Sequence, residues 1–503
     1  MGPMLHSPLP MRKTASPRDI YLLAIGGTGM APLACLLQEQ GHGVRGTDGP
    51  LYPPMSTLLE RAGIHPTVGY DPAHLEPRPD LVVVGNAIHR ANPEALAAER
   101  EGIPLASMPE ALARFFLAGR RPLVVAGTHG KTTTTAMAAW VYRECGMDPG
   151  YLIGGAPCDL PSSFHDGDGD RFVIEGDEYN AAYFDRGPKF LHYRPETLLL
   201  TSVEYDHADL YPTPEALRAA YETLVALLPA DGLLVACGDT PEVRAVAARA
   251  RCPVVLYGLG EGNGLRPLGP IEARPEGSRL RVWDGASEIE IEIAMAGEHN
   301  VTNALAVWAA ARRDGLPAAA VARALARFRG VKRRLEELPA GGGIAVVDDF
   351  AHHPTAVEKT LGALRQRYPG RRLVVLFEPR SLTAGRRMFD GAYHAAFRGA
   401  DRVLFAPTYH AGRLADGERL DFAGLAADLT VAGVPADLLA DTGEVFSRAL
   451  AEARPGDVLV TMSSGSFDGM PHRLAAALAA QAAQVAQTEV GWRAAASEAP
   501  GAA

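Results

Sequence analysis

The sequence has few cysteines and no apolar segment long enough to cross a membrane. Its five cysteines lie at positions 35, 145, 158, 237 and 252 and form no Cys-x-x-Cys pair. Isolated cysteines are typical of a reducing compartment and argue against a disulfide framework or a structural zinc site. No apolar run approaches the roughly 18 residues of a membrane span, and residues 1–17 lack the apolar core of a signal peptide. We therefore expect a cytoplasmic protein with no membrane insertion.

Basic residues are outnumbered by acidic ones, 49 Lys and Arg against 59 Asp and Glu, which gives a formal net charge of −10. This excess argues against an extended nucleic-acid surface, so we expect no nucleic-acid partner. The length of 503 residues exceeds what one hydrophobic core supports. We expect three α/β domains, at 18–120, 121–330 and 331–485. The Pro- and Ser-rich start (1–17) and the Ala- and Gln-rich end (486–503) are expected to be disordered.

A strand, a glycine-bracketed turn and a helix form the most informative motif. Residues 123–126 are apolar and predict a buried strand, and an alanine-rich helix is expected from about Lys131 to Cys145. The N–H groups of such a loop and the positive end of the helix dipole bind anions. In nucleotide-binding loops the lysine reaches a β- or γ-phosphate and the following threonine holds Mg²⁺, the positions of Lys131 and Thr132 here. The candidate nucleotide contacts of this loop are Gly127, Thr128, His129, Gly130, Lys131, Thr132 and Thr133.

The motif departs from the standard P-loop at one position. The outer glycine, five residues before Gly130, is replaced by Val125, so only the shorter Gly-Thr-His-Gly-Lys-Thr pattern is present. A glycine turn between a core strand and a helix, with an incidental lysine, is the simpler alternative. The position of Gly-Lys-Thr at a strand-to-helix junction favours the phosphate site.

The first domain opens with a strand at Ile20–Ile25 and a glycine-rich turn, and its second strand ends at Asp48. A βαβ unit with a glycine turn and an acidic residue about 20 positions later is typical of dinucleotide folds. The third glycine of that fingerprint is Pro32, so a nucleotide-diphosphate site fits better than an NAD site, and purely structural glycines remain an alternative. The candidate ligand contacts are Gly26, Gly27, Thr28, Gly29, Met30 and Asp48, with Asn86 and Arg90 in the loop after strand 81–84.

Two further strands of the central domain end in acidic residues. Strand 172–175 runs into Glu175, Asp177 and Glu178, and carboxylates at a strand end are what a Mg²⁺·nucleotide site needs opposite a P-loop. Strand 197–201 runs into a segment containing His207, which is either a metal ligand or a surface histidine. Polar residues that open the helix ending near residue 313 either cap it or face a purine: His299, Asn300 and Asn303.

The third domain also places polar residues at strand ends. Strands at 344–347, 373–377 and 458–461 are followed by acidic, hydroxyl or histidine residues, which predicts an α/β sheet with one functional edge. Candidate residues at this edge are Asp349, His352 and Arg380.

Together these motifs, in this order over residues 20–480, resemble the Mur ligases, the ATP-dependent amide-forming enzymes of peptidoglycan synthesis. The turn at 26–30 with Asp48 resembles that family's UDP-sugar loop, and residues 127–132 resemble its short P-loop. The resemblance implies an α/β fold of three domains: a Rossmann-like UDP-N-acetylmuramate-binding domain, a central P-loop ATPase domain with a parallel sheet, and a C-terminal Rossmann-like ligase domain.

The resemblance also implies roles for single residues. It assigns Lys131, His207 and Arg334 to catalysis, with Arg334 reaching an ATP phosphate from the hinge. Magnesium ligands would be Thr132, Glu175 and, for a second ion near the acyl phosphate, His207. His299, Asn300, Asn303 and Asp349 would contact the nucleotide, Asp349 at the ribose. Arg380 would bind the far carboxylate of a peptide, since Arg pairs with carboxylates bidentately, and His352 would lie in the same substrate region.

The chain has no lysine between Lys189 and Lys332, where several Mur ligases carry a carbamylated lysine, which favours the branch that accepts free UDP-N-acetylmuramate. One member of this branch adds L-alanine, and another adds the tripeptide L-alanyl-γ-D-glutamyl-meso-diaminopimelate during peptidoglycan recycling. Segments 177–185, 189–195, 204–209, 349–354 and 377–381 resemble the tripeptide-adding member. We therefore expect tripeptide ligation with ATP and Mg²⁺, with L-alanine ligation as the alternative.

Two other functions stay open from the residues alone. One is a P-loop ATPase whose hydrolysis drives motion without ligation. The other is an NAD-dependent oxidoreductase that uses the first domain, against which Pro32 argues.

Overall fold

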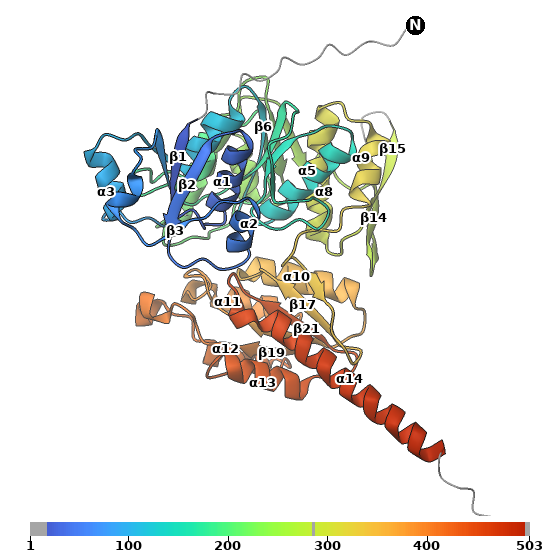
Figure 1. The fold of residues 1–503 in the computed structure, drawn as a ribbon. Coiled ribbons are helices and arrows are strands. Elements are labelled where there is room, and N and C mark those ends of the chain that lie inside the picture. Colours follow the sequence, from blue (N-terminus) through green and yellow to red (C-terminus); the bar gives the residue numbers. More distant parts are fainter. Residues whose placement is uncertain (1–17, 284–286, 498–503) are drawn as a thin grey trace, which may run out of the picture.

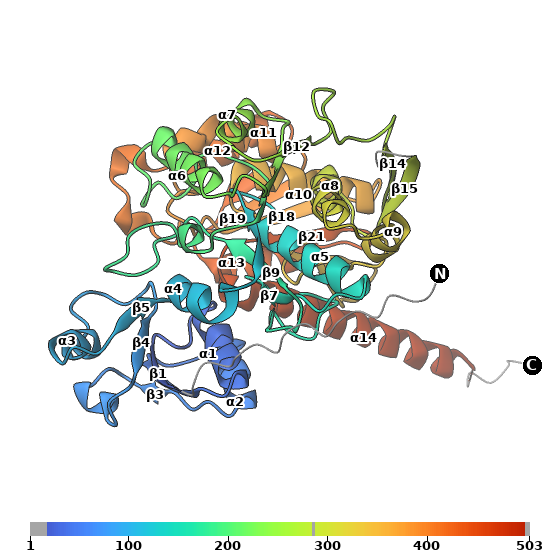
Figure 2. The ribbon, with the colours of Figure 1, turned by 90° about the horizontal axis from the view of Figure 1, so that it is seen from above.

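The computed structural model describes residues 18–283 and 287–497, which form four sheets. In Figure 1 the first domain, in blue, and the central domain, in teal to yellow, lie above the third domain, in orange and red. Seen from above in Figure 2, the first domain lies to one side of the central domain. The α/β class and the three-domain architecture predicted from the sequence are confirmed. The boundaries at 120 and 330 stay predictions, and residues 1–17 lie outside the described part.

The first sheet has five parallel strands in the order β3-β2-β1-β4-β5. Its strands are β1 (Asp19–Leu23), β2 (Gly43–Asp48), β3 (Thr67–Val68), β4 (Leu81–Val84) and β5 (Leu105–Ser107). Its helices are α1 (Met30–Glu39), α2 (Met55–Arg61), α3 (Pro93–Arg100) and α4 (Met108–Leu112), with short helices at Pro72–Leu75 and Ala113–Leu117. The order reverses between β1 and β4, and sheets of this kind bind ligands at the carboxyl ends of the strands beside that reversal.

The central sheet has seven strands in the order β12-β11-β10-β6-β9-β7-β8, all parallel except β8, which is antiparallel to β7. The strands are β6 (Arg121–Ala126), β7 (Gly150–Leu152), β8 (Phe164–His165), β9 (Arg171–Gly176), β10 (Thr197–Leu200), β11 (Leu233–Cys237) and β12 (Val254–Tyr257). Strand β6 lies between β9 and β10. The carboxyl ends of these three strands therefore meet at one edge, and their loops build the candidate site.

Helices cover both faces of the central sheet, and a small antiparallel sheet lies beside it. The helices are α5 (Lys131–Glu144), α6 (Pro214–Ala226), α7 (Pro241–Ala247), α8 (Glu298–Arg313) and α9 (Ala318–Leu325), with a short helix at Lys189–His192. The small sheet consists of β13 (Glu272–Arg274), β14 (Gly277–Trp283) and β15 (Glu288–Ile293). Alternating apolar residues of β14 and β15, such as Leu280 and Ile291, pack into the same core as α5 and α8.

The third sheet has six strands in the order β16-β17-β21-β18-β19-β20, with only β16 antiparallel to its neighbour among the described strands. The strands are β16 (Glu336–Leu338), β17 (Ala345–Asp349), β18 (Leu373–Phe377), β19 (Arg402–Phe405), β20 (Ala436–Leu438) and β21 (Val458–Met462). The helices are α10 (Pro354–Arg367), α11 (Asp390–Phe397), α12 (Phe422–Val431), α13 (Thr442–Glu452) and α14 (Met470–Ser497), with short helices at Arg387–Phe389, Ala411–Arg413, Asp416–Glu418 and Phe467–Gly469.

Helix α14 continues to Ser497 and projects away from the body of the third domain (Figures 1 and 2). It extends into the tail at 486–503 for which the sequence predicts disorder. Alanine has the highest helix propensity, so the Ala-rich composition on which that prediction rested also favours a continued helix. Residues 498–503 lie outside the described part. Within residues 18–283 and 287–497, no helix is both long enough and apolar enough to cross a bilayer.

Candidate nucleotide-binding and ligation site

The loop between β6 and α5 is shaped by two glycines. Gly127 has φ +135° and Gly130 has φ +79°, conformations that side chains rarely adopt. A Cβ atom at Gly127 would lie 2.3 Å from Thr201 Oγ1, and one at Gly130 would lie 2.8 Å from Asn303 Oδ1. No side chain of the described residues caps the start of α5, so its first N–H groups are available to an anion.

Lys131, at the start of α5, is the cation of this loop. Its Nζ donates hydrogen bonds to Gly127 O at 2.7 Å and to Glu178 Oε1 at 2.9 Å. Burial alone would lower the pKa of this amine, but Glu178 and two neighbouring carboxylates outweigh burial and raise the pKa. Lys131 is therefore a permanently charged group, held at the mouth of the loop where a β- or γ-phosphate would lie.

Glu178 connects the P-loop lysine to His207. Its side chain is almost fully buried, and its Oε1 lies 3.2 Å from His207 Nε2. Burial alone would raise the pKa of Glu178, but Lys131 and His207 lower it. Conversely, Glu178 and Asp206 raise the pKa of His207 against the effect of burial. The sequence predicts a carboxylate site from Glu175, Asp177 and Glu178 at the end of β9 and assigns the magnesium to Glu175. The charge pattern alone does not show that Glu178 is the carboxylate that faces the lysine.

Thr132 and Glu175 form a candidate magnesium site next to the Lys131–Glu178–His207 cluster. Thr132 Oγ1 donates to Glu175 Oε1 at 2.9 Å, and Gly154 N donates to Glu175 Oε2, also at 2.9 Å. Two adjacent ligands of an octahedral Mg²⁺ lie about 3 Å apart, so these oxygens fit one magnesium ion. Burial and the neighbouring Asp177 raise the pKa of Glu175, and a bound cation would oppose that shift.

His207 has a left-handed backbone conformation, with φ +54°. Such a conformation is strained for a non-glycine residue and is typical of functional sites. Its backbone N–H donates to Asp206 Oδ1 at 2.7 Å, and its ring lies against Tyr179, with centroids 4.4 Å apart. His207 is thus positioned by Glu178 rather than by Glu175, and its predicted role as a metal ligand stays a prediction.

The start of α8 lies against the P-loop. Asn303 contacts Gly130 as described, and its Nδ2 lies 3.4 Å from Asn300 Oδ1. Asn300 donates in turn to Ala296 O at 2.8 Å. Burial and the cation Lys359 lower the pKa of His299 to about 4, so the imidazole is neutral at pH 7. The three residues predicted to meet the nucleotide therefore share one helix terminus beside the phosphate loop.

The hinge between the central and third domains carries Arg334. Its guanidinium lies over the Phe350 ring, 4.6 Å from the centroid. Asp349 accepts hydrogen bonds from the main chain of Leu335 and Ala351, both at 2.8 Å, and from Thr360 Oγ1 at 3.2 Å. Asp349 thus fixes the hinge, and its predicted contact with a ribose would use the remaining oxygen lone pairs.

The glycine turn of the first domain is held closed by Asp48. Its Oδ2 accepts from Gly26 N at 2.7 Å and its Oδ1 from Gly49 N at 2.7 Å. Thr28 is exposed and Gly27 and Gly29 are partly exposed, whereas the Met30 side chain is buried in the core. Asn86 and Arg90 are exposed after β4, at the same end of the sheet. Met30 could therefore meet a ligand through its main chain but not through its side chain.

The third domain brings His352 and Arg380 toward the same region from strand ends. His352 Nε2 lies 4.0 Å from Asp206 Oδ2 in the central domain. Arg380 follows β18, lies 3.9 Å from the Tyr409 ring centroid and 3.6 Å from Glu378 Oε1. Gly465 makes room for this guanidinium, because a Cβ there would lie 2.0 Å from Arg380 Cδ.

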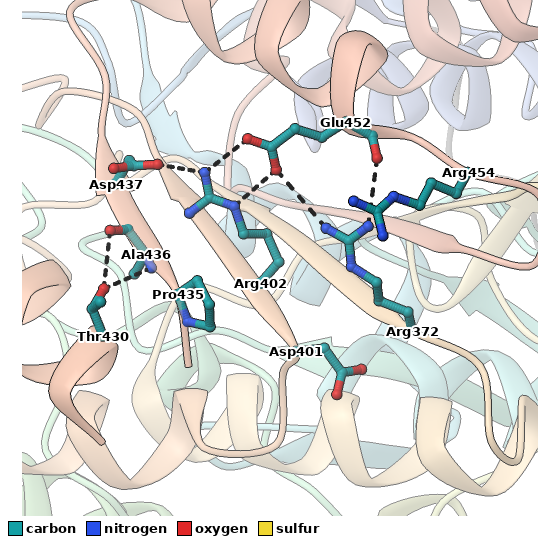
Figure 3. Close-up of a pocket in the computed structure, with 9 residues that line it drawn as sticks. All are labelled: Arg372, Asp401, Arg402, Thr430, Pro435, Ala436, Asp437, Glu452 and Arg454. Atoms are coloured by element: carbon teal, nitrogen blue, oxygen red, sulfur yellow. Dashed lines mark hydrogen bonds and ion pairs between the residues drawn. The ribbon is translucent and has the colours of Figure 1, made fainter. Parts of the chain in front are cut away.

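A separate hollow of about 480 Å³ lies at the opposite edge of the third sheet, where β18, β19 and β20 begin (Figure 3). Charged side chains that line it pair with one another: Arg402 Nε lies 2.9 Å from Glu452 Oε2 and also contacts Asp437, and Arg372 Nη2 lies 3.9 Å from Glu452 Oε2. Ligands of such sheets bind at the carboxyl ends of the strands, so we assign this hollow no part in the site.

Comparison with known proteins agrees with this geometry. Family models match in three consecutive parts: "Mur ligase family, catalytic domain" at 19–120, "Mur ligase middle domain" at 125–311 and "Mur ligase, glutamate ligase domain" at 333–465. The UDP-N-acetylmuramate–L-alanyl-γ-D-glutamyl-meso-2,6-diaminoheptandioate ligase of Escherichia coli K12 is 39% identical, over 92% of this chain and all (100%) of its own. The UDP-N-acetylmuramate–L-alanine ligase of Kineococcus radiotolerans is 40% identical, over 89% of this chain and 93% of its own.

A solved structure resembles the whole chain. The murein peptide ligase of Psychrobacter arcticus 273-4 superposes with a TM-score of 0.69 at 33% identity, covering 92% of this chain and 99% of that one. Fold and site together define a nucleotide-dependent ligase with a short P-loop. The chain belongs to the Mur ligase family, and it is an ATP-dependent enzyme that forms an amide bond.

Proposed function

We propose that this enzyme joins UDP-N-acetylmuramate to the tripeptide L-alanyl-γ-D-glutamyl-meso-diaminopimelate, in the recycling of cell-wall peptide. The observation that carries the proposal is the convergence of the Lys131–Glu178–His207 cluster and the Thr132–Glu175 pair at one sheet edge. The 39% identity to the tripeptide ligase of Escherichia coli, over that protein's full length, supports the choice of substrate. Use of ATP and a nucleotide sugar is consistent with a cytoplasmic location.

The P-loop would bind the phosphates of ATP. The N-terminus of α5 and Lys131 supply positive charge to the β- and γ-phosphates, and Arg334 adds a second cation from the hinge. Asn303, against Gly130, orients the start of α8 toward the same nucleotide. His299 and Asp349 would contact its base and ribose.

Thr132 and Glu175 would hold Mg²⁺, and His207 would hold a second ion. Magnesium supplies neutralisation of charge on the transferring phosphoryl group. The residues that surround it set its position: Gly154 N fixes Glu175, and Glu178 fixes His207.

The proposed chemistry has two steps. The lactyl carboxylate of UDP-N-acetylmuramate attacks the γ-phosphate, which gives an acyl phosphate and ADP, while Lys131 and Arg334 stabilise the transferring charge. The free α-amine of the peptide then attacks the acyl carbon, which forms the amide and releases phosphate. Contact between the central and third domains, as between Asp206 and His352, would exclude water from the acyl phosphate.

Arg380 would bind the far carboxylate of the tripeptide. Its guanidinium is stacked on Tyr409 and reaches the site edge through the space above Gly465. A charged hydrogen bond of about 1.5–3 kcal/mol corresponds to roughly a 10–100-fold rise in the KM for tripeptide on Arg380→Ala. L-alanine lacks that distant carboxylate, so the same change would leave its KM unaltered.

The decisive experiment measures ADP release with UDP-N-acetylmuramate and either the tripeptide or L-alanine. We expect turnover with the tripeptide and little ADP release in the absence of amine. Turnover with L-alanine in place of tripeptide would establish the alternative ligase. ATP hydrolysis that needs neither amine nor sugar would instead support an ATPase.

A further inference from the structure

Three potential metal ligands from separate parts of the chain meet beside the P-loop. His129 belongs to the P-loop, Glu204 follows β10, and His353 caps α10 in the third domain. One ligand atom from each lies within 4.8 Å of the others. The nearest approaches are 3.3 Å from His129 Nε2 to Glu204 Oε2 and 3.8 Å from His353 Nδ1 to the same oxygen.

One of the two ring nitrogens of His353, Nε2, has no protein partner among the described residues. The residue is 6% exposed, and this nitrogen is buried. Its Nδ1 only accepts a long hydrogen bond, 3.3 Å, from Thr355 N. A buried polar nitrogen without a partner is costly, and a ligand that engages this ring would remove that cost.

Glu204 is the shared member of this cluster. Its Oε2 is approached by His129 Nε2 from the P-loop and by His353 Nδ1 from the third domain. Thr355 Oγ1 donates to Glu204 Oε2 at 2.6 Å and orients that carboxylate across the domain interface.

We propose that His129, Glu204 and His353 form a further metal site, separate from the magnesium sites, which takes one transition-metal dication of the Zn²⁺ class. Two imidazoles and one carboxylate form a set that zinc binds with a fourth position open, whereas magnesium prefers an all-oxygen set. The site is therefore chemically distinct from the Thr132–Glu175 pair, where both ligand atoms are oxygens.

The proposed metal site lies between the central and third domains. Two ligands belong to the central domain and one to the third domain, so a bound ion ties the third domain to the P-loop. The His129 and His353 rings already lie 4.8 Å apart between centroids. An ion held there would restrain the opening that exchange of nucleotide and product requires.

The test uses the full chain, stripped with a chelator and free of magnesium, titrated with Co²⁺. Tetrahedral Co²⁺ with nitrogen ligands gives visible absorption, and elemental analysis after Zn²⁺ loading gives the stoichiometry. We expect one ion per chain, and a loss of affinity of at least about tenfold in His353→Gln and in Glu204→Gln.

Two variants serve as controls. His394→Gln removes a partly exposed histidine of the third domain that lies near Asp428, outside the site, and should bind Co²⁺ as the unaltered chain does. Glu175→Gln alters the magnesium pair and should also keep the Co²⁺ signal. Thermal melts of each metal-free variant identify those that fail to fold, and His129→Gln provides a third ligand change in another domain.

Two results would overturn the proposal. One is the absence of Co²⁺ and Zn²⁺ binding by the unaltered chain at micromolar concentration. The other is binding that survives in folded His353→Gln, Glu204→Gln and His129→Gln but is lost in Glu175→Gln. Because the readout is metal binding, these outcomes are independent of whether the enzyme ligates the tripeptide.

Discussion

At the scale of single residues, the site depends on which carboxylate faces which cation. The sequence shows a cluster of acids at the end of β9 but not that Glu178 faces Lys131 and His207 while Glu175 faces Thr132. It does not show the contacts of Glu204 with His129 and Thr355 either, because these contacts join segments far apart in the chain. Only the tertiary structure shows which side chains are partners of this kind.

Lys131→Ala should abolish ADP formation, because it removes the cation that stabilises the transferring phosphoryl group and leaves Glu178 facing only His207. Loss of such a charge contact typically costs about 10³-fold or more in turnover. The measurement is coupled ADP release, with UDP-N-acetylmuramate binding by calorimetry as the folding control. Lys332→Ala, at an exposed lysine, should retain activity; normal turnover of Lys131→Ala would contradict the assignment.

His299 should make stability depend on pH. Burial and Lys359 lower its pKa from about 6.5 to about 4 in the folded chain, so the unfolded state binds more protons between these values. The stabilising contribution is complete above pH 6.5 and is lost as pH falls through 4. Melting temperatures from pH 8 to pH 4 should therefore fall less steeply in His299→Gln. An identical slope in both proteins would show that His299 is not buried neutral.

At the scale of elements, local signals in the sequence mark where several helices begin. Several helices begin with a cap residue followed by proline, as at Asn92–Pro93, Thr213–Pro214, Thr240–Pro241 and His353–Pro354. Helix α11 begins differently, because a 3₁₀ turn at Arg387–Phe389 directly precedes it.

The end of α8 is anchored by a buried charge cluster. Asp314, which caps α8, accepts from Arg171 Nε of β9 at 2.7 Å and from the Tyr142 hydroxyl of α5 at 2.5 Å. The side chains of Arg171 and Asp314 are 1% and 3% exposed. This cluster ties the nucleotide-facing helix to the P-loop helix at its far end.

Asp314→Ala should destabilise the chain by about 3–5 kcal/mol, because it leaves the buried guanidinium of Arg171 without its main partner. Urea unfolding followed by circular dichroism measures the loss. Asp428→Ala, at an exposed position on α12, should change stability by less than about 0.5 kcal/mol. A similar small effect for Asp314→Ala would show that Glu196, 3.4 Å from Arg171, compensates.

At the scale of the whole molecule, we expect activity to depend on how the third domain lies on the central domain. Gln366 of α10 forms a polar contact between these two domains. It accepts from Gly297 N at 2.9 Å and donates to Arg274 O and Gly277 O at 2.9 and 2.7 Å. Gly297 directly precedes α8, so this contact sets the third domain against the start of the nucleotide-facing helix.

Gln366→Ala should therefore lower kcat by roughly 10-fold while leaving ATP-independent binding of UDP-N-acetylmuramate unchanged. The loss of several partly buried hydrogen bonds, each about 1 kcal/mol, would favour separated domains. Steady-state kinetics measures the change in kcat, and small-angle scattering measures the separation of the domains. Gln38→Ala, at an exposed position on α1, is the matched control. Unchanged kcat with an expanded molecule would show that domain contact does not limit turnover.

The sequence by itself determined the fold class, the family and the catalytic loop. These depend on local order along the chain: apolar strands, glycines where φ is positive, and charged residues at strand ends. Only the tertiary structure decided the pairing of Lys131 with Glu178 and the meeting of His129, Glu204 and His353. The reason is physical: a side chain's pKa and partners are set by burial and by neighbours from other strands and domains, which sequence spacing does not specify.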